Sequence, residues 1–263
     1  MQQKEQPSSN VTDIEIQLIT RINIKNERHM LITGCAILPN EHLLFANYNR
    51  RRNILEYSKE GNYISSIQVY AEPYDITVLD SERIAITYGY NGFFEILNYC
   101  NNSVEKKIET GSHCWGLSQS NGKIYIQLDK VECFDTTCKK LFTMAVAGDF
   151  HISASKTNLF CSNSLNNNVY CYDMHGQEVW KFRDDSLQSP LGVTHDRSGN
   201  VFVVGRKSRK LILIQHDGKT YKNLLNLKNY SAPVAVCYNK DKHNLLYCDK
   251  KGDYCALYKV LNT

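Results

Sequence analysis

Short hydrophobic runs recur along the chain at a nearly constant spacing. One segment of nine residues starts at Asn53, Phe93, Lys130, Asn168, Lys210 and Asp253. Its second and fifth positions are apolar or aromatic in every copy, as Ile54 and Tyr57 are in the first. Self-similarity with a period near 40 residues is typical of repeat architectures. The pattern therefore predicts six copies of one structural unit.

Each unit contains further strand-like runs rich in β-branched and aromatic residues and bounded by Asn, Gly, Asp or Lys. One run precedes each nine-residue segment, at 43–47, 83–87, 123–127, 158–162, 200–204 and 244–248. Another opens each repeat, at 34–38, 74–78, 115–119, 151–155, 191–195 and 234–238. A fourth run follows the first five nine-residue segments. Five repeats therefore carry four predicted strands each.

The sixth repeat lacks its fourth strand, because only residues 261–263 follow its last run. Residues 14–24 alternate, which is a strand pattern, and one side carries Ile14, Ile16, Leu18, Thr20, Ile22 and Ile24. We predict that this N-terminal strand completes the last blade and closes an all-β, six-bladed β-propeller of four-stranded antiparallel blades over residues 14–263. The alternative is a stray edge strand on an open array. Residues 1–13 are polar and predicted to be a disordered tail.

Composition adds few constraints on function. The net charge is +4, the first dozen residues hold no apolar stretch, and no window approaches a membrane span. We expect a monomeric, cytoplasmic protein that does not bind membranes. Ten cysteines occur, mostly inside predicted strands and without Cys-x2-Cys spacing. We expect them to be reduced, and we expect no metal and no cofactor.

Repeat five carries a family resemblance. Residues 190–218 resemble an NHL repeat through Pro190, Gly192, Val193, Asp196, Gly199, Val201, Phe202, Val203, Lys210, Leu211 and Gly218. Gly205, Ser208 and Arg209 depart from that pattern. The resemblance implies a propeller like the C-terminal domain of tripartite-motif (TRIM) proteins, which serves as a substrate- or RNA-binding end. The chain has no RING, B-box or coiled-coil segment, so only the recognition half of such a ubiquitin-ligase system is implied.

Basic residues concentrate in the turns between the second and third strands of adjacent blades. In a meander these turns share one face with the connections between blades. The residues, here called the basic crescent, are Arg50, Arg51, Arg52, Arg206, Lys207, Arg209, Lys210, Lys250 and Lys251. Tyr48, Tyr88 and Tyr90 lie near the same turns and could stack on bases. The crescent is typical of a surface for nucleic acid or an acidic partner; the alternative is a solvated surface that aids solubility.

Chemistry at the centre of the ring is the remaining possibility, because propellers of this size also include metal-dependent hydrolases and lyases. The inner-strand candidates are Asp75, His113, His151, His195 and Asp196. At about 3.3 Å per residue, His113 and His195 differ in depth by roughly 20 Å, so the three histidines cannot share one metal. Asp75 and His151 are closer in depth but lie two blades apart. No Ser/His/Asp grouping is visible.

We therefore expect a non-enzymatic binding platform that recognises a protein or peptide partner through the face bearing the crescent. Binding of single-stranded RNA by the same face is one alternative, and a metal-dependent hydrolase or lyase is another.

Overall fold

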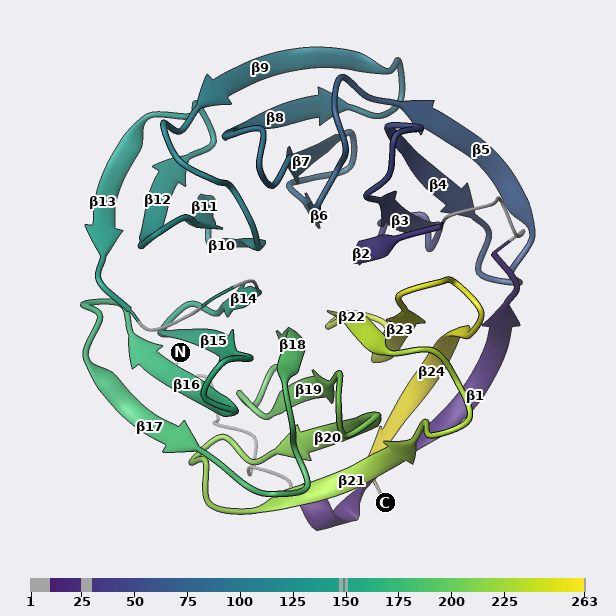
Figure 1. Cartoon of the computed structure of the whole chain (residues 1–263), viewed down its shortest axis with the longest axis vertical. Helices are drawn as coiled ribbons and strands as arrows, with labels where there is room; N and C mark the ends of the chain where they lie inside the picture. Colours follow the sequence, from purple (N-terminus) through teal and green to yellow (C-terminus); the bar gives the residue numbers. More distant parts are fainter. Residues whose placement is uncertain (1–9, 25–29, 147–148, 150, 263) are drawn as a thin grey trace, which may run out of the picture.

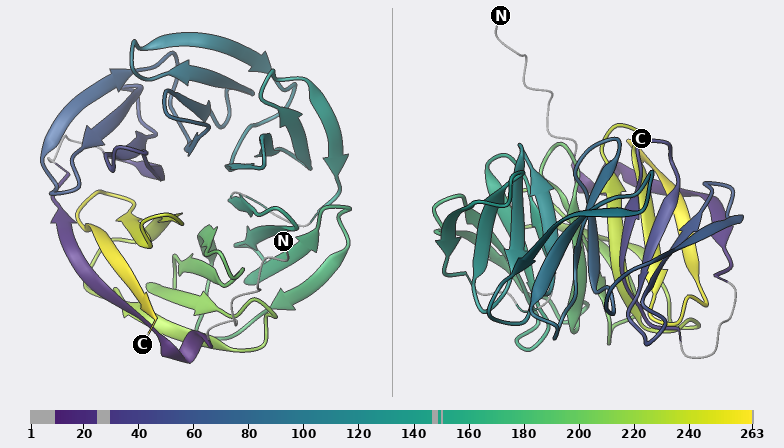
Figure 2. Two further views of the ribbon diagram at one scale, coloured as in Figure 1. Left: turned by 180° about the vertical axis from the view of Figure 1, so that it is seen from behind. Right: turned by 90° about the horizontal axis from the view of Figure 1, so that it is seen from above.

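The chain forms a ring of six antiparallel sheets around a central channel (Figure 1). The computed structural model describes residues 10–24, 30–146, 149 and 151–262. Each sheet has four strands. In five sheets neighbouring strands are consecutive in the chain, whereas the sixth has the strand order β1-β24-β23-β22. The predicted six-bladed propeller is therefore confirmed, and its blades stand side by side across a disc (Figure 2).

The strand boundaries follow the sequence pattern closely. Blades 1 to 3 comprise β2 (Ile32–Ile37), β3 (Leu43–Asn47), β4 (Asn53–Tyr57), β5 (Tyr63–Gln68), β6 (Asp75–Val78), β7 (Arg83–Thr87), β8 (Phe93–Asn98), β9 (Ser103–Glu109), β10 (Leu117–Ser120), β11 (Lys123–Gln127), β12 (Val131–Asp135) and β13 (Lys140–Met144). Blades 4 to 6 comprise β14 (Ile152–Ala154), β15 (Asn158–Asn163), β16 (Asn168–Asp173), β17 (Glu178–Phe182), β18 (Pro190–His195), β19 (Val201–Gly205), β20 (Lys210–Ile214), β21 (Tyr221–Asn226), β22 (Pro233–Asn239), β23 (Asn244–Asp249), β24 (Cys255–Asn262) and β1 (Ile14–Ile22).

The N-terminal strand closes the ring. β1 pairs antiparallel with β24 from Ile14 opposite Asn262 to Ile22 opposite Cys255, and the two strands lie side by side in both face views (Figures 1 and 2). The side chains of Ile14 and Ile22 are each 1% exposed. The predicted closure is confirmed, and the open array is excluded.

The start of the described chain differs from the prediction. Residues Val11–Asp13, which we expected in the disordered tail, form the short 3-10 helix η1, and Val11 is fully buried. The side chain of Asn10 caps η1 by accepting a hydrogen bond from the Thr12 N–H. Residues 1–9 of the predicted tail lie outside the described residues.

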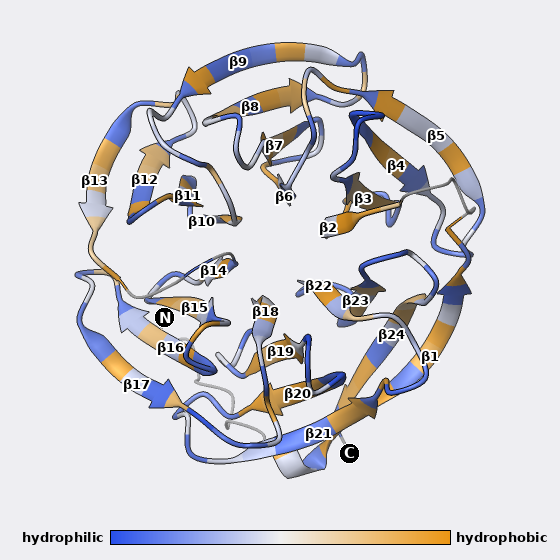
Figure 3. Ribbon diagram, in the orientation of Figure 1, coloured by the Kyte–Doolittle hydropathy of each residue, from blue (hydrophilic) through white to orange (hydrophobic). Residues whose placement is uncertain are grey.

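The hydrophobic core is divided among the spaces between neighbouring blades rather than gathered at the centre. One cluster joins blades 1 and 2 and includes Ile54 and Ile86, while another joins blades 4 and 5 and includes Phe160 and Val203. The middle strands of each blade are hydrophobic, whereas the outermost strands carry hydrophilic stretches (Figure 3). In β9, for example, almost every residue is exposed. Interblade packing therefore leaves the loops on both faces free to carry function.

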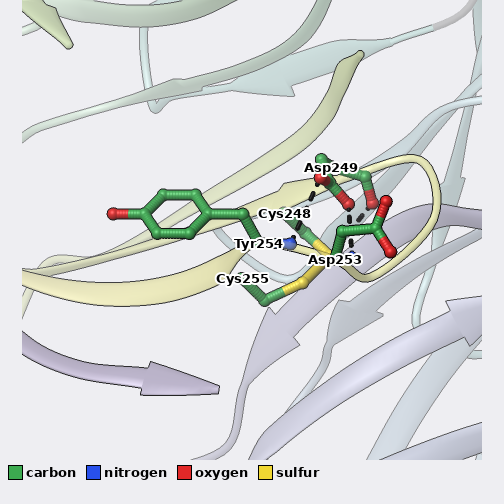
Figure 4. Close-up of a disulfide and its surroundings, with 5 residues drawn as sticks. All are labelled: Cys248, Asp249, Asp253, Tyr254 and Cys255. Atoms are coloured by element: carbon green, nitrogen blue, oxygen red, sulfur yellow. Dashed lines mark hydrogen bonds between the residues drawn. A yellow bond between two sulfur atoms is a disulfide. The ribbon is translucent and has the colours of Figure 1, made fainter. Parts of the chain in front are cut away.

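A disulfide corrects the expectation that all cysteines are reduced. Cys248 of β23 and Cys255 of β24 lie directly opposite each other and form a disulfide (Figure 4). Both residues are fully buried beside the turn that carries Lys250 and Lys251. In the chain-entropy account, closing so short a loop lowers the conformational entropy of the unfolded chain and so stabilises the folded state by about 2 kcal/mol.

The location of the protein stays a prediction. Within the described residues, no helix has the length and hydrophobicity needed to cross a bilayer. Disulfides persist mainly in oxidising compartments, and the Cys248–Cys255 bond therefore does not favour the predicted cytoplasmic location.

Candidate ligand-binding site at the channel mouth

A pocket opens where the channel meets the face formed by the second-to-third turns and the interblade connections, here called the loop face. Its volume is about 330 Å³. Each blade contributes a side chain to this mouth pocket: Tyr48, Tyr90, Trp115, His151, Arg206 and Lys250, from blades 1 to 6 in that order. The ring thus brings together residues that are up to 202 positions apart in the sequence.

Aromatic rings line the part of the mouth pocket that belongs to blades 1 to 4. The Tyr74 ring contacts Tyr48 and Trp115 edge to face, with centroids 5.5 and 5.0 Å apart, and stacks on His151 at 5.7 Å. Tyr90 packs edge to face on Trp115 at 4.8 Å. We call these five residues the aromatic arc. Because each ring is held by another ring, the arc presents a pre-formed surface for a flat or apolar group.

A glycine is required beside the arc. Gly89 has a φ of +54°, and a Cβ on it would lie 2.7 Å from the hydroxyl oxygen of Tyr48. Any larger residue would strain the β7–β8 turn and displace Tyr48. The preceding residue, Tyr88, anchors the turn to the blade. Local sequence in this turn therefore sets the position of two rings of the arc, Tyr48 and Tyr90.

Two cations face the arc from blades 5 and 6. Arg206 and Lys250 directly follow β19 and β23, and their backbone N–H groups donate to the carbonyls of Ser189 and Ala232. Neither side chain forms an ion pair with another described residue. The mouth pocket therefore has an aromatic side and a positively charged side, which suits a group that is both flat and anionic.

A buried carboxyl group lies beneath the pocket. Asp75 Oδ1 accepts from the Ile76 N–H at 2.9 Å, and Oδ2 accepts from the Leu117 N–H of the next blade at 3.0 Å. Burial raises the pKa of Asp75 to about 7 and lowers the pKa of His151 to about 4. Asp75 Oδ2 and His151 Nδ1 are 4.0 Å apart. With these pKa values the imidazole is neutral at pH 7, so the two groups do not form a stable ion pair.

The ring places the predicted basic crescent on three consecutive blades, 5, 6 and 1 (Figure 1). Arg50, Arg51, Arg206, Lys207 and Lys251 are exposed, and Lys210 and Lys250 are half-buried. The other two residues support loops: Arg52 lies 3.9 Å from Glu72, and Arg209 donates to the carbonyls of Lys228 and Tyr230. Binding by any member of the crescent stays a prediction.

The proposed stacking role of Tyr88 is wrong. Its side chain is fully buried in the core between blades 1 and 2, where the ring stacks on Phe93 and the hydroxyl donates to Glu95 at 2.6 Å. Tyr48 and Tyr88 both directly follow the second strand of their blades, but the Tyr88 ring enters the core, whereas Tyr48 and Tyr90 reach the mouth pocket.

Sequence reasoning missed Tyr74, Trp115 and Leu191 of the mouth pocket. A signal was present, because Tyr74 and Trp115 stand just before the inner strands of blades 2 and 3. Asp75 and His151 lie two blades apart as predicted, on blades 2 and 4, but the narrow channel brings their side chains within 4.0 Å of each other.

The described residues contain no group of three or more His, Cys, Asp or Glu side chains that could hold a metal ion. His113 packs against Tyr90 on the loop face, while His195 contacts Lys240 on the opposite face. The three histidines named from sequence therefore do not converge.

The fold resembles solved propellers at low sequence identity. One, a protein of unknown function from Bacteroides thetaiotaomicron, has a TM-score of 0.75 at 11% identity over 94% of this chain and 76% of its own. Catalytically inactive virginiamycin B lyase from Staphylococcus aureus with quinupristin gives a TM-score of 0.67 at 11% identity, over 94% of this chain and all of that one. A streptogramin B lyase gives a TM-score of 0.66 at 12% identity, over 95% of this chain and 99% of its own.

These likenesses show the fold alone. No family model matches the chain, and no curated protein matches it. The NHL and TRIM resemblance of repeat five therefore stays a hypothesis.

Proposed function

We propose that the protein is a binding platform that recognises a peptide segment of a protein partner on its loop face. The observation that carries this proposal is the mouth pocket, in which the aromatic arc faces Arg206 and Lys250. A volume of about 330 Å³ suits one large side chain and its neighbours. The segment would insert an aromatic side chain next to Trp115 and place a carboxylate near Arg206 and Lys250.

A place in a ubiquitin-ligase system is a narrower form of the same proposal. It rests on the NHL-like residues of 190–218 and on the recognition role that such propellers have in TRIM proteins. In that arrangement the propeller would select the substrate, and a separate protein would supply the ligase.

The peptide proposal predicts a specific loss of binding. In a Trp180→Phe background, Trp115 is the remaining tryptophan and reports on the mouth pocket by its fluorescence. Short peptides with one aromatic residue between Asp or Glu residues should change that fluorescence on titration. The double variant Arg206→Glu/Lys250→Glu should bind them at least about tenfold more weakly, because it reverses the charge that attracts them.

The matched control is Lys139→Glu/Lys242→Glu, which makes the same change in charge in exposed turns on the opposite face. It should leave affinity unchanged. Equal weakening by both double variants would show that only net charge matters, and the mouth pocket would then not be the binding site.

Single-stranded RNA is the second candidate, favoured by exposed cations that continue outward from the pocket along blades 5, 6 and 1. Bases would stack on Tyr48 or Tyr90 while the phosphates follow the crescent. Replacing Arg50, Arg51, Arg52, Arg206, Lys207 and Lys210 with Glu should abolish retention of oligouridylate and flatten its salt dependence. Retention that is unchanged by these substitutions would exclude the crescent as an RNA-binding surface.

A further inference from the structure

A second pocket lies on the face opposite the mouth pocket, beneath blades 4, 5 and 6. We call it the rear pocket; its volume is about 630 Å³. The first-to-second turns of blades 4 and 5 border it, with Lys156 and Arg197 among the lining residues. His195 and Lys240 also line it, from blades 5 and 6. The peptide and RNA proposals do not involve this site.

Three polar side chains from consecutive blades form a hydrogen-bonded chain at this pocket. Ser153 of β14 lies with its Oγ 2.8 Å from His195 Nδ1, and Lys240 Nζ lies 2.5 Å from His195 Nε2. Ser153 and His195 are buried, and the imidazole packs at 5.2 Å on Phe160. Lys240 is half-buried and closes the chain on the pocket side. The amine is therefore held in one place by a rigid ring.

Lys240 differs from the lysines that pair with acids. The Lys59 and Lys140 ammonium groups contact the carboxylates of Glu41 and Glu132. Within the described residues, Lys240 forms no ion pair, and the partner of its Nζ is an imidazole nitrogen. Carboxylates hold a lysine in its charged form, whereas a neutral ring nitrogen can accept a hydrogen bond from either form of the amine.

The surroundings favour the uncharged amine. Burial lowers the pKa of Lys240, and Arg197 lowers it further, while Asp196 and Cys237 act in the opposite direction. Burial, followed by the charge of Lys240, lowers the pKa of His195 to about 3, so the imidazole is neutral. Asp196 is itself buried, and burial raises its pKa. The free lone pair of an uncharged lysine is a nucleophile.

We infer that Lys240 is a nucleophilic amine that forms a reversible imine with a small oxo acid bound in the rear pocket. The Nζ lone pair attacks the carbonyl carbon and forms a C–N bond. The carbonyl oxygen takes up the two protons that the amine loses and leaves as water, so no oxidant or reductant is needed. Lys156 would attract the carboxylate, while Arg197 is held beside the pocket by its ion pair with Asp241. His195 positions the amine.

Glyoxylate with sodium cyanoborohydride tests this inference, because reduction traps the imine as a stable carboxymethyl group. The folded protein is treated at pH 7, and the modified lysines are quantified by mass spectrometry. Lys240 should react about tenfold faster than the exposed Lys139 and Lys242, because burial lowers its pKa and the rear pocket holds glyoxylate beside its amine. The rate at Lys240 should also reach its plateau at a lower pH than the rates at the two reference lysines.

Two variants separate the roles. Lys240→Arg should abolish the fast-reacting site, and His195→Gln should reduce its rate toward that of the reference lysines while circular dichroism confirms the fold. A Lys240 that reacts no faster than Lys139 and Lys242 in folded protein would overturn the inference. Because the mouth pocket is on the other face, this result leaves the peptide proposal unaffected.

Discussion

A chain that lacks residues 1–24 should not fold into a stable monomer. The deletion removes β1 and three isoleucines, Ile14, Ile22 and Ile24, that are each 1% exposed. Burial of such side chains contributes about 1.5–3 kcal/mol each, so the loss is about 5–9 kcal/mol, close to the whole stability of an ordinary domain. It also leaves the edge of β24 unpaired, and unpaired edges associate. Circular dichroism and size-exclusion chromatography with light scattering would detect unfolding and association.

Two further samples make this test specific to ring closure. Ile19→Ala changes a side chain of the same strand that is 48% exposed, and should alter stability by no more than about 0.5 kcal/mol. A synthetic peptide of residues 10–24 added to the truncated chain should restore the fold by pairing with β24. A truncated chain that stays monomeric and melts like the full chain would contradict closure by β1.

The second large effect concerns pH and the buried Asp75. Its pKa rises from 3.8 to about 7 on folding, so the folded state holds this proton more tightly than the unfolded state. The associated stability is fully present below pH 4 and is lost as the pH rises through 7, by about 4 kcal/mol at about 1.4 kcal/mol per pKa unit. The contribution of His151 to stability changes with pH in the opposite direction. Its pKa falls from 6.5 to about 4 on folding, so this stability is lost on acidification.

In the unchanged protein these two contributions largely offset each other between pH 4 and 6.5. Asp75→Asn should therefore reveal a stability that rises with pH over this range, and His151→Gln should reveal one that falls. Urea unfolding at steps of pH from 4 to 8 measures both. The exposed Asp129→Asn serves as control and should leave the profile unchanged. Superimposable profiles for Asp75→Asn and the unchanged protein would refute a buried protonated carboxyl group.

Much of the fold was predictable because it depends on a local pattern repeated many times. Alternation of apolar residues defines each strand, and the six copies give independent evidence for one unit. The missing last strand and the alternation from Ile14 to Ile24 together indicated the closure. The Cys248–Cys255 bond was not predictable in this way, because facing cysteines depend on the register of two strands and not on a spacing motif.

The sites were less predictable, because they depend on distances across the ring. Blade order placed Arg206 and Lys250 near Tyr48 correctly on the loop face. Side-chain direction at a turn depends on backbone geometry that the pattern does not determine, which is why Tyr88 was assigned to the surface. Ser153, His195 and Lys240 were not recognised as a group, because they lie on three different blades at different positions of the inner strand.

The contribution of one side chain per blade to the mouth pocket has an evolutionary consequence. Each of those residues precedes or follows a strand, outside the packed spaces between blades, so its substitution leaves the packing that closes the ring intact. Specificity can then diverge one blade at a time, while the scaffold that holds the ring shut remains under separate selection.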